Sequence, residues 1–152
     1  KRVVVYDRDG NFISQIGGEG SQPGQFNEPV GIAVDADNHV YFADSWNRRV
    51  QVLQIDASGN LTPTNSWQVE GWGSQSIDHK PFLCICQNNL FATDPEHNQI
   101  LQFNLQGALI ETLDLKSKGI LIDGIPNGVA CDPTGGIWIS DLKYNMWSHL
   151  TP

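Results

Sequence analysis

The chain repeats one pattern along its length, and this repeat limits the possible fold more than any other feature. The pattern is an apolar segment that begins with proline, a short polar turn, and a second apolar segment that ends with aspartate. It occurs three times from residue 29 onwards, the third time in shortened form. The aspartates that end the second segment, Asp44, Asp94 and Asp141, are spaced by 50 and 47 residues. A period of this size, with several short strands per unit, is typical of β-propeller blades.

Each unit is predicted to hold four strands, called A to D here in chain order. Residues 31–34, 40–43 and 50–54 read as strands A to C of the first complete unit, with strand D near 66–70. Polar turns separate these segments, and the apolar runs are nearly continuous, as in strands covered on both faces. No segment of useful length has helical periodicity, so we predict an all-β fold.

The repeat register predicts an incomplete propeller, because residues 2–6 align with strand C of the first complete unit. The single segment 1–152 divides into 1–26 (strands C and D), the full blades 27–77 and 78–122, and 123–152 (strands A and B and the start of C). About three blades cannot close a ring, and two blade faces would be exposed. We expect a homodimer that closes a six-bladed ring, or else the remainder of a longer propeller chain. In the dimer, the start of one chain and the end of the other would both supply strand C of the same blade.

Charge and hydropathy exclude some classes of partner. The chain has 9 Lys and Arg against 17 Asp and Glu, a net charge of −8. Nucleic-acid binding depends on neutralising phosphates, so we expect no nucleic-acid partner. No apolar run approaches the roughly 20 residues that a membrane-spanning helix needs. The compartment cannot be read from the sequence.

Three cysteines make an odd number, and no disulfide framework is predicted. Cys86 and Cys131 occupy the register position of Val34 in strand A, and Cys84 occupies that of Ile32. Cysteine can replace a small buried apolar residue at such positions. A zinc site at Cys84 and Cys86 is the alternative, although the spacing lacks the usual two-residue gap.

The recurring polar positions of the repeat suggest structural roles within each unit. An aspartate at the end of strand B can accept backbone N–H groups of the turn that follows. Arg49 and its register equivalent Arg2 can pair with such aspartates. The proline before each strand A suits the beginning of a strand, where no ladder hydrogen bond is needed.

The segments Pro-Val-Gly-Ile-Ala-Val-Asp (29–35) and Val-Tyr-Phe-Ala-Asp-Ser-Trp-Asn-Arg-Arg-Val-Gln-Val (40–52) resemble NHL repeats. The resemblance covers nearly the whole chain, but later units are looser: Asn47-Arg-Arg49 becomes His97-Asn-Gln99 and then Tyr144-Asn-Met146. It implies β-propeller blades with strand A lining the axis. Most propellers of this family are binding platforms and a minority are enzymes.

The loops that join strands D to A and B to C share one rim, around the mouth of the axial channel, where ligands usually bind. We therefore predict a non-catalytic module that binds a protein, a peptide or a small ligand there. Trp46 and Tyr144 are the expected anchors. The predicted rim residues are Asn27, Glu28, Trp46, Asn47, Asp78, His79, Lys80, Glu96, His97, Asn127, Lys143 and Tyr144.

A metal-dependent hydrolase or lyase is the alternative. The Pro-Asn-Gly segment at 126–128 is similar to that of gluconolactonase-like propellers, whose Asn binds a divalent metal. The resemblance implies the same role for Asn127. Such an ion needs further oxygen ligands, for example Glu28 with Asp78 or Asp123. Amidating-lyase-like propellers use histidine ligands. Only His79 and His97 could share the mouth, so we expect no catalytic residue, metal or other cofactor.

Overall fold

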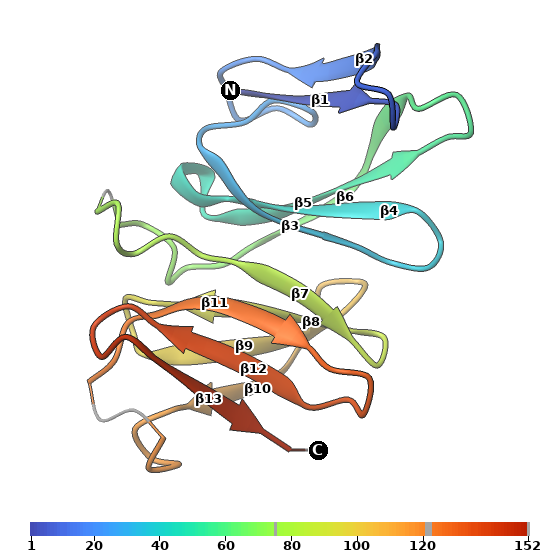
Figure 1. Ribbon diagram of the computed structural model, residues 1–152. Helices are drawn as coiled ribbons and strands as arrows, with labels where there is room; N and C mark the ends of the chain where they lie inside the picture. Colours follow the sequence, from blue (N-terminus) through green and yellow to red (C-terminus); the bar gives the residue numbers. More distant parts are fainter. Residues whose placement is uncertain (75, 121–122, 152) are drawn as a thin grey trace.

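The computed structural model describes residues 1–74, 76–120 and 123–151. These residues form thirteen strands in four antiparallel sheets, and the all-β prediction is confirmed. The sheets follow one another along the chain and stack as successive blades, from the N-terminus at the top of Figure 1 to the C-terminus at the bottom. In the described part of the chain, no helix is long and apolar enough to span a bilayer.

Two blades have four strands and two have fewer. Blade 1 is β1 (Arg2–Tyr6) and β2 (Phe12–Gly17). Blade 2 is β3 (Pro29–Val34), β4 (His39–Asp44), β5 (Arg49–Ile55) and β6 (Leu61–Gln68), with a 3-10 turn, η1 (Ser45–Asn47), between β4 and β5. Blade 3 is β7 (Leu83–Cys86), β8 (Asn89–Asp94), β9 (Gln99–Asn104) and β10 (Leu109–Asp114). Blade 4 is β11 (Pro126–Cys131), β12 (Ile137–Asp141) and β13 (Met146–Leu150).

Within each full blade, neighbouring strands pair in chain order, so strands A to D run from the inside outwards. The outer strand of blade 2 begins earlier than predicted, at Leu61 rather than near Ser66. The preceding turn explains this early start. Asp56 Oδ1 accepts the N–H groups of Ser58 and Asn60, which closes a short turn, and β6 begins at the next residue. Pro63 is tolerated because β6 is an edge strand.

The core lies between blades rather than inside any one of them. The largest cluster joins blades 2 and 3 through buried Tyr41, Val52, Leu90 and Phe103. Gly31 allows this approach, because a Cβ there would lie 2.9 Å from the Pro81 carbonyl oxygen. A second cluster joins blades 3 and 4, and a third packs blade 1 against blade 2.

A disulfide joins Cys86 of β7 to Cys131 of β11, and the prediction of no disulfide is therefore wrong. The inner strands of blades 3 and 4 lie side by side, which places the two Cα atoms 5.3 Å apart. The alternative zinc site at Cys84 and Cys86 is also wrong, since Cys86 is consumed by the bond. Cys84 is a free thiol, and burial raises its pKa to about 12.

Candidate binding site at the propeller mouth

The loops that join strands B and C at the predicted rim share one backbone conformation at the residue before strand C. Arg48, Asn98 and Asn145 occupy equivalent positions and all have left-handed backbones, with φ of 51°, 53° and 52°. Asparagine tolerates this conformation better than most residues. Each loop therefore turns in the same way at the same rim, which lies on the left of Figure 1 beside η1.

The aspartate that ends strand B holds the rim of blade 2 in place, but its backbone donor belongs to the loop before strand A and not, as predicted, to the turn that follows. Asp44 Oδ1 accepts the N–H of Asn27, and Oδ2 accepts bonds from Asn47 Nδ2 and Arg49 Nε. In blade 4, Asp141 accepts the N–H groups of residues 125 and 144. The predicted pairing of Arg49 is confirmed at 2.9 Å, with both side chains buried. Arg2 pairs with no aspartate among the described residues, because it lies exposed on β1.

The structure brings four predicted rim residues from blades 2 and 3 together around Trp46. Lys80 Nζ lies 2.7 Å from Glu28 Oε2 and 5.8 Å from the centre of the Trp46 ring. Lys1 approaches the same ring to 5.3 Å and donates to Asn27 Oδ1 at 2.7 Å. Ammonium groups over an indole ring are attracted by its π electrons, so Trp46 is held in place while 42% of it remains exposed.

A second polar group forms beside blade 4. Asp123 pairs with the ammonium of Lys143 and accepts a hydrogen bond from the Tyr144 hydroxyl. The bond from Lys143 lowers the pKa of Asp123, and the carboxylate in turn raises the pKa of Tyr144. Asn127 accepts a hydrogen bond from Ser140 at 3.0 Å. Of the expected metal ligands, Glu28, Asn127 and Asp123 are thus engaged with cationic or hydroxyl donors of the chain.

The histidines do not meet at the mouth. His79 Nδ1 lies 3.6 Å from Glu96, whereas His97 Nδ1 lies 2.9 Å from Asp94. His97 lines a different cavity, between the outer strands of blades 2 and 3. Among the described residues, no group of three or more His, Cys, Asp or Glu side chains could hold a metal ion.

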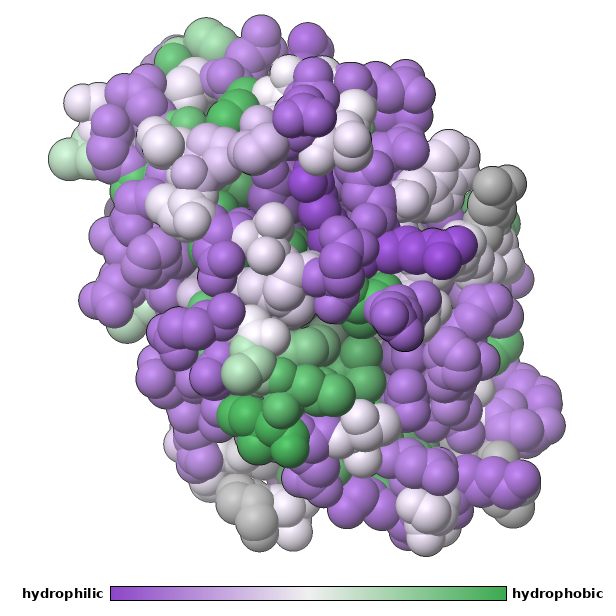
Figure 2. All heavy atoms as spheres, turned by 180° about the vertical axis from the view of Figure 1, so that it is seen from behind, coloured by the Kyte–Doolittle hydropathy of each residue, from purple (hydrophilic) through white to green (hydrophobic). Residues whose placement is uncertain are grey.

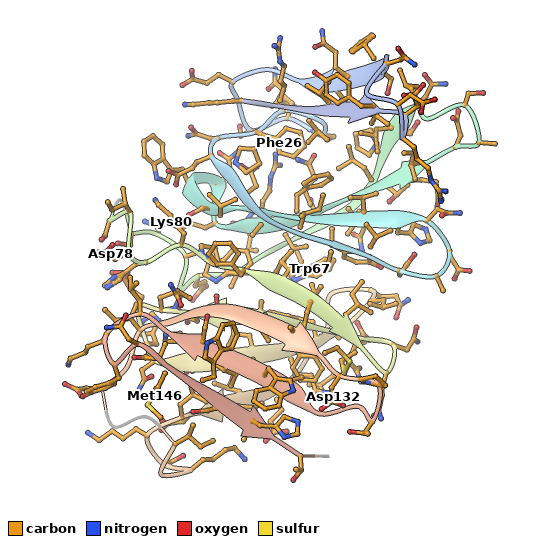
Figure 3. All side chains as sticks on the ribbon, in the orientation of Figure 1. Phe26, Trp67, Asp78, Lys80, Asp132 and Met146 are labelled. Atoms are coloured by element: carbon orange, nitrogen blue, oxygen red, sulfur yellow. A yellow bond between two sulfur atoms is a disulfide. The ribbon has the colours of Figure 1, made fainter. Side chains whose placement is uncertain are left out.

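A cavity of about 550 Å³ opens where the inner strands of blades 2, 3 and 4 begin. Figure 3 labels Asp78 and Lys80 on this side of the molecule. Three of the lining residues were predicted from the sequence. The apolar lining residues were not, and they include Ile77, which is 85% exposed. An exposed apolar residue in a predicted rim loop is the signal that could have found Ile77. The lining residues are Pro29, Val30, Ile77, Asp78, Lys80, Phe82, Asn127 and Leu142.

Sequence comparison agrees with this architecture. The NHL-repeat family model matches residues 26–53, which span the start of blade 2 through most of β5. The human E3 ubiquitin-protein ligase TRIM32 is 28% identical over 138 residues, covering 84% of this chain and 21% of that protein. Mouse NHL repeat-containing protein 3 is 24% identical over 161 residues, covering 99% of this chain and 45% of the relative. The chain thus spans less than half the length of these relatives.

Solved propellers share the fold. A catalytically inactive virginiamycin B lyase from Staphylococcus aureus matches with a TM-score of 0.65 and 16% identity, over 99% of this chain and 45% of the lyase. A putative 6-phosphogluconolactonase from Bacteroides uniformis matches with a TM-score of 0.64 and 17% identity, over 98% and 45% of the two chains. These matches show the β-propeller fold, and within it residues 26–53 match the NHL repeat.

Proposed function

We propose that this chain is a non-catalytic binding module that holds a protein or peptide segment at the propeller mouth. The observation that carries the proposal is the cavity of about 550 Å³, in which exposed apolar side chains lie beside an ordered charge pair. Such a combination is typical of binding sites, because apolar contacts supply affinity and a few fixed polar groups supply orientation. Trp46 and Ile77 are the proposed anchors.

Trp46 and the charge pair beside it lie on a backbone that is fixed before a ligand arrives. Trp46 is part of η1, and the left-handed backbone at Arg48 ends this turn. Glu28 also has a left-handed backbone, with φ of 75°, and its carboxylate holds Lys80. A strained residue of this kind persists only where the surroundings stabilise it, and such residues cluster at functional sites. A preformed rim loses little conformational freedom on binding.

The experiment is differential capture on immobilised protein, with bound proteins identified by mass spectrometry. Trp46→Ala and Ile77→Ser should each lose a common set of captured proteins, and thermal unfolding should change little because both side chains are substantially exposed. Phe12→Ser is the matched control, since Phe12 is 60% exposed on the opposite rim. Equal loss in all three variants, or no loss in the first two, would contradict the proposal.

The enzymatic alternative makes a different prediction. Two structural matches carry enzyme names, but at 16% and 17% identity they bear on the fold alone. We propose that the module acts without a metal or other cofactor, because Glu28, Asn127 and Asp123 already have partners within the chain. Calcium, zinc and manganese should therefore leave the melting temperature unchanged. A shift of several degrees that a chelator reverses would favour the alternative.

The proposal extends to how the open arc is closed. On β3, Gly31 faces blade 3, so Ile32 faces the opposite side, where blade 1 lacks inner strands and Ile32 is 58% exposed. At the other end, Trp138 and Trp147 are exposed on the free face of blade 4. We infer that further blades cover both faces, from a second copy or from a longer propeller chain.

Light scattering of this 16.8 kDa chain over a range of concentrations separates the two sources. A stable mass of twice the monomer would support closure by a second copy, and a monomer would assign the covering blades to a longer chain. In a closed dimer, either β1 or β13 must be displaced, because both are formed and paired as strand C. A dimer in which both strands keep their amide protection would contradict ring closure.

A further inference from the structure

The outer surfaces of blades 2 and 3 are equivalent in sequence register but are covered differently. In blade 2, the loop before β3 lies along the outer strands and is tied down by two side chains. Arg49 donates to the carbonyl oxygens of Ser21 and Gln25, at 2.7 and 2.8 Å. Gln51 accepts the N–H of Gly24 at 2.6 Å and donates to Gln25. A segment of the chain's own backbone, with a hydrogen-bonded turn at residues 22–25, thus occupies this groove.

The same groove is open in blade 3. In the pairing of strands B and C, Gln99 and Leu101 occupy the positions of Arg49 and Gln51. The two side chains that hold the loop in blade 2 are therefore replaced in blade 3 by a shorter and an apolar one. A cavity of about 480 Å³ lies there, between the end of β6 and strands β9 and β10. Leu101, Phe103 and Leu109 give it an apolar wall. On the back of the molecule, Figure 2 shows a hydrophobic area in the lower half, bordered by hydrophilic side chains.

One end of the cavity carries a buried carboxylate with an unused oxygen. Asp94 is 1% exposed, and its Oδ2 contacts His97 and Gln99 at 2.9 and 2.8 Å. Its Oδ1 has no hydrogen-bond partner among the described residues. In blade 2, both oxygens of the equivalent Asp44 are bonded, and Arg49 supplies a fixed positive charge. A buried acceptor without a partner is costly, most of all when it is charged.

We propose that this groove binds an extended peptide segment of a partner protein that carries an arginine, whose guanidinium takes the unused oxygen of Asp94. Arginine suits the site better than lysine, because its planar fork bonds a carboxylate oxygen and neighbouring acceptors together. Glu70 and Gln68 line the same end of the cavity and add acceptor oxygens. Apolar residues beside the arginine would contact Leu101 and Leu109.

Two further observations favour a basic peptide. The loop of blade 2 shows that a segment of backbone fits this surface of a blade, in that case with the arginine on the blade instead of on the segment. The net charge of −8 would also attract a basic segment from a distance.

The test uses two blocked pentapeptides, Leu-Pro-Arg-Leu-Phe and the same peptide with neutral citrulline in place of arginine. Each is titrated into ¹⁵N-labelled protein, and amide shifts are followed by NMR. The arginine peptide should shift the amides of 68–71, Asp94 and Gln99 in a saturable way. The citrulline peptide should bind at least about tenfold more weakly, because it lacks the charge-assisted bond. Equal affinity, or no binding of either at millimolar concentration, would overturn the proposal.

Two substitutions locate the site. Gln99→Arg places a guanidinium beside Asp94 from within the chain and should abolish the preference for arginine; Asp94→Asn should do the same if Gln99→Arg does not fold. Asp9→Asn removes one negative charge from an exposed turn of blade 1 and should leave the affinity unchanged. Ile77→Ser separates this site from the mouth, since it should not change arginine-peptide binding. Free N-acetylarginine amide that binds as tightly as the pentapeptide would argue against a peptide groove.

Discussion

Blades 2 and 3 have the same strand order and the same buried aspartate at the end of strand B, yet they solve the burial of that charge differently. In blade 2, Asp44 is neutralised by Arg49, which also holds the preceding loop. In blade 3, Asp94 is in contact with His97 and Gln99 instead, and one oxygen has no partner among the described residues. The comparison teaches that the repeat keeps the buried aspartate, while both its backbone donor and the partner of its charge can change.

Of the substitutions that test this difference between the blades, Arg49→Ala should cause the largest loss of stability. The change leaves the Asp44 carboxylate buried without a counter-charge and frees the carbonyl oxygens of Ser21 and Gln25, so it should cost about 3–5 kcal/mol of unfolding free energy. Gln99→Ala removes one neutral donor from Asp94 and should cost about 1 kcal/mol. Urea unfolding measures both values. Equal losses would show that the two aspartates are stabilised alike.

The junctions of the two blades differ as well, which leads to the second prediction. Blades 2 and 3 meet through an apolar cluster and non-covalent polar contacts, whereas Cys86 and Cys131 link blades 3 and 4 covalently across 45 residues. Replacing both cysteines with alanine should cost about 2–4 kcal/mol, mainly by releasing the unfolded chain. A reducing agent should lower the unfolding midpoint of the native chain toward that of the variant. A midpoint that does not respond to reductant would contradict the role assigned to the bond.

Sequence register explains why the fold was predictable and the disulfide was missed. Proline before each strand A, polar turns and a terminal aspartate recur in every unit, and these local signals position the strands. Cys86 and Cys131 occupy one register position in consecutive units. Equivalent positions of neighbouring inner strands lie side by side in a propeller, so this shared register was the available signal for the bond.

The polar rim could be predicted in part from the sequence, whereas the cavities could not. Loop connectivity places Glu28, Trp46 and Lys80 on one rim, and the structure brings their side chains together. The apolar lining residues and the orphan oxygen of Asp94 depend on how the loop before blade 3 runs. The sequence shows that Gln99 and Leu101 replace the tethers Arg49 and Gln51, but the cavity that their absence leaves open depends on how the blades pack.

The third prediction converts blade 3 toward blade 2. Gln99→Arg should place a guanidinium against the Asp94 carboxylate and raise the free energy of unfolding by about 1 kcal/mol, which is modest because burying the new charge offsets much of the new bond. A double-mutant cycle with Asp94→Asn measures the coupling between the two side chains. A destabilised Gln99→Arg protein with no coupling to Asp94 would show that the two blades bury their aspartates in dissimilar surroundings.

The smallest expected effect concerns acid, and it separates the blades by their A–B turns. In blade 2, partial burial alone would raise the pKa of Asp35, but hydrogen bonds from His39 and Tyr41 outweigh it and lower the pKa. Blade 3 has Gln87 at the equivalent position, which does not titrate. Because the folded-state pKa of Asp35 lies below the unfolded value of about 4, its contribution is complete above that value and is lost as the pH falls through the folded pKa.

Acid should therefore loosen blade 2 before blade 3. Amide hydrogen exchange between about pH 5 and pH 2.5, corrected for the intrinsic exchange rate, should show protection at Tyr41 falling earlier than at Phe91. Asp35→Asn should remove this difference, whereas Asp37→Asn, which changes an exposed neighbour in the same turn, should preserve it. If protection at both amides falls together in the native chain, the acid response belongs to a group shared by the blades. The contrast between their turns would then have no energetic consequence.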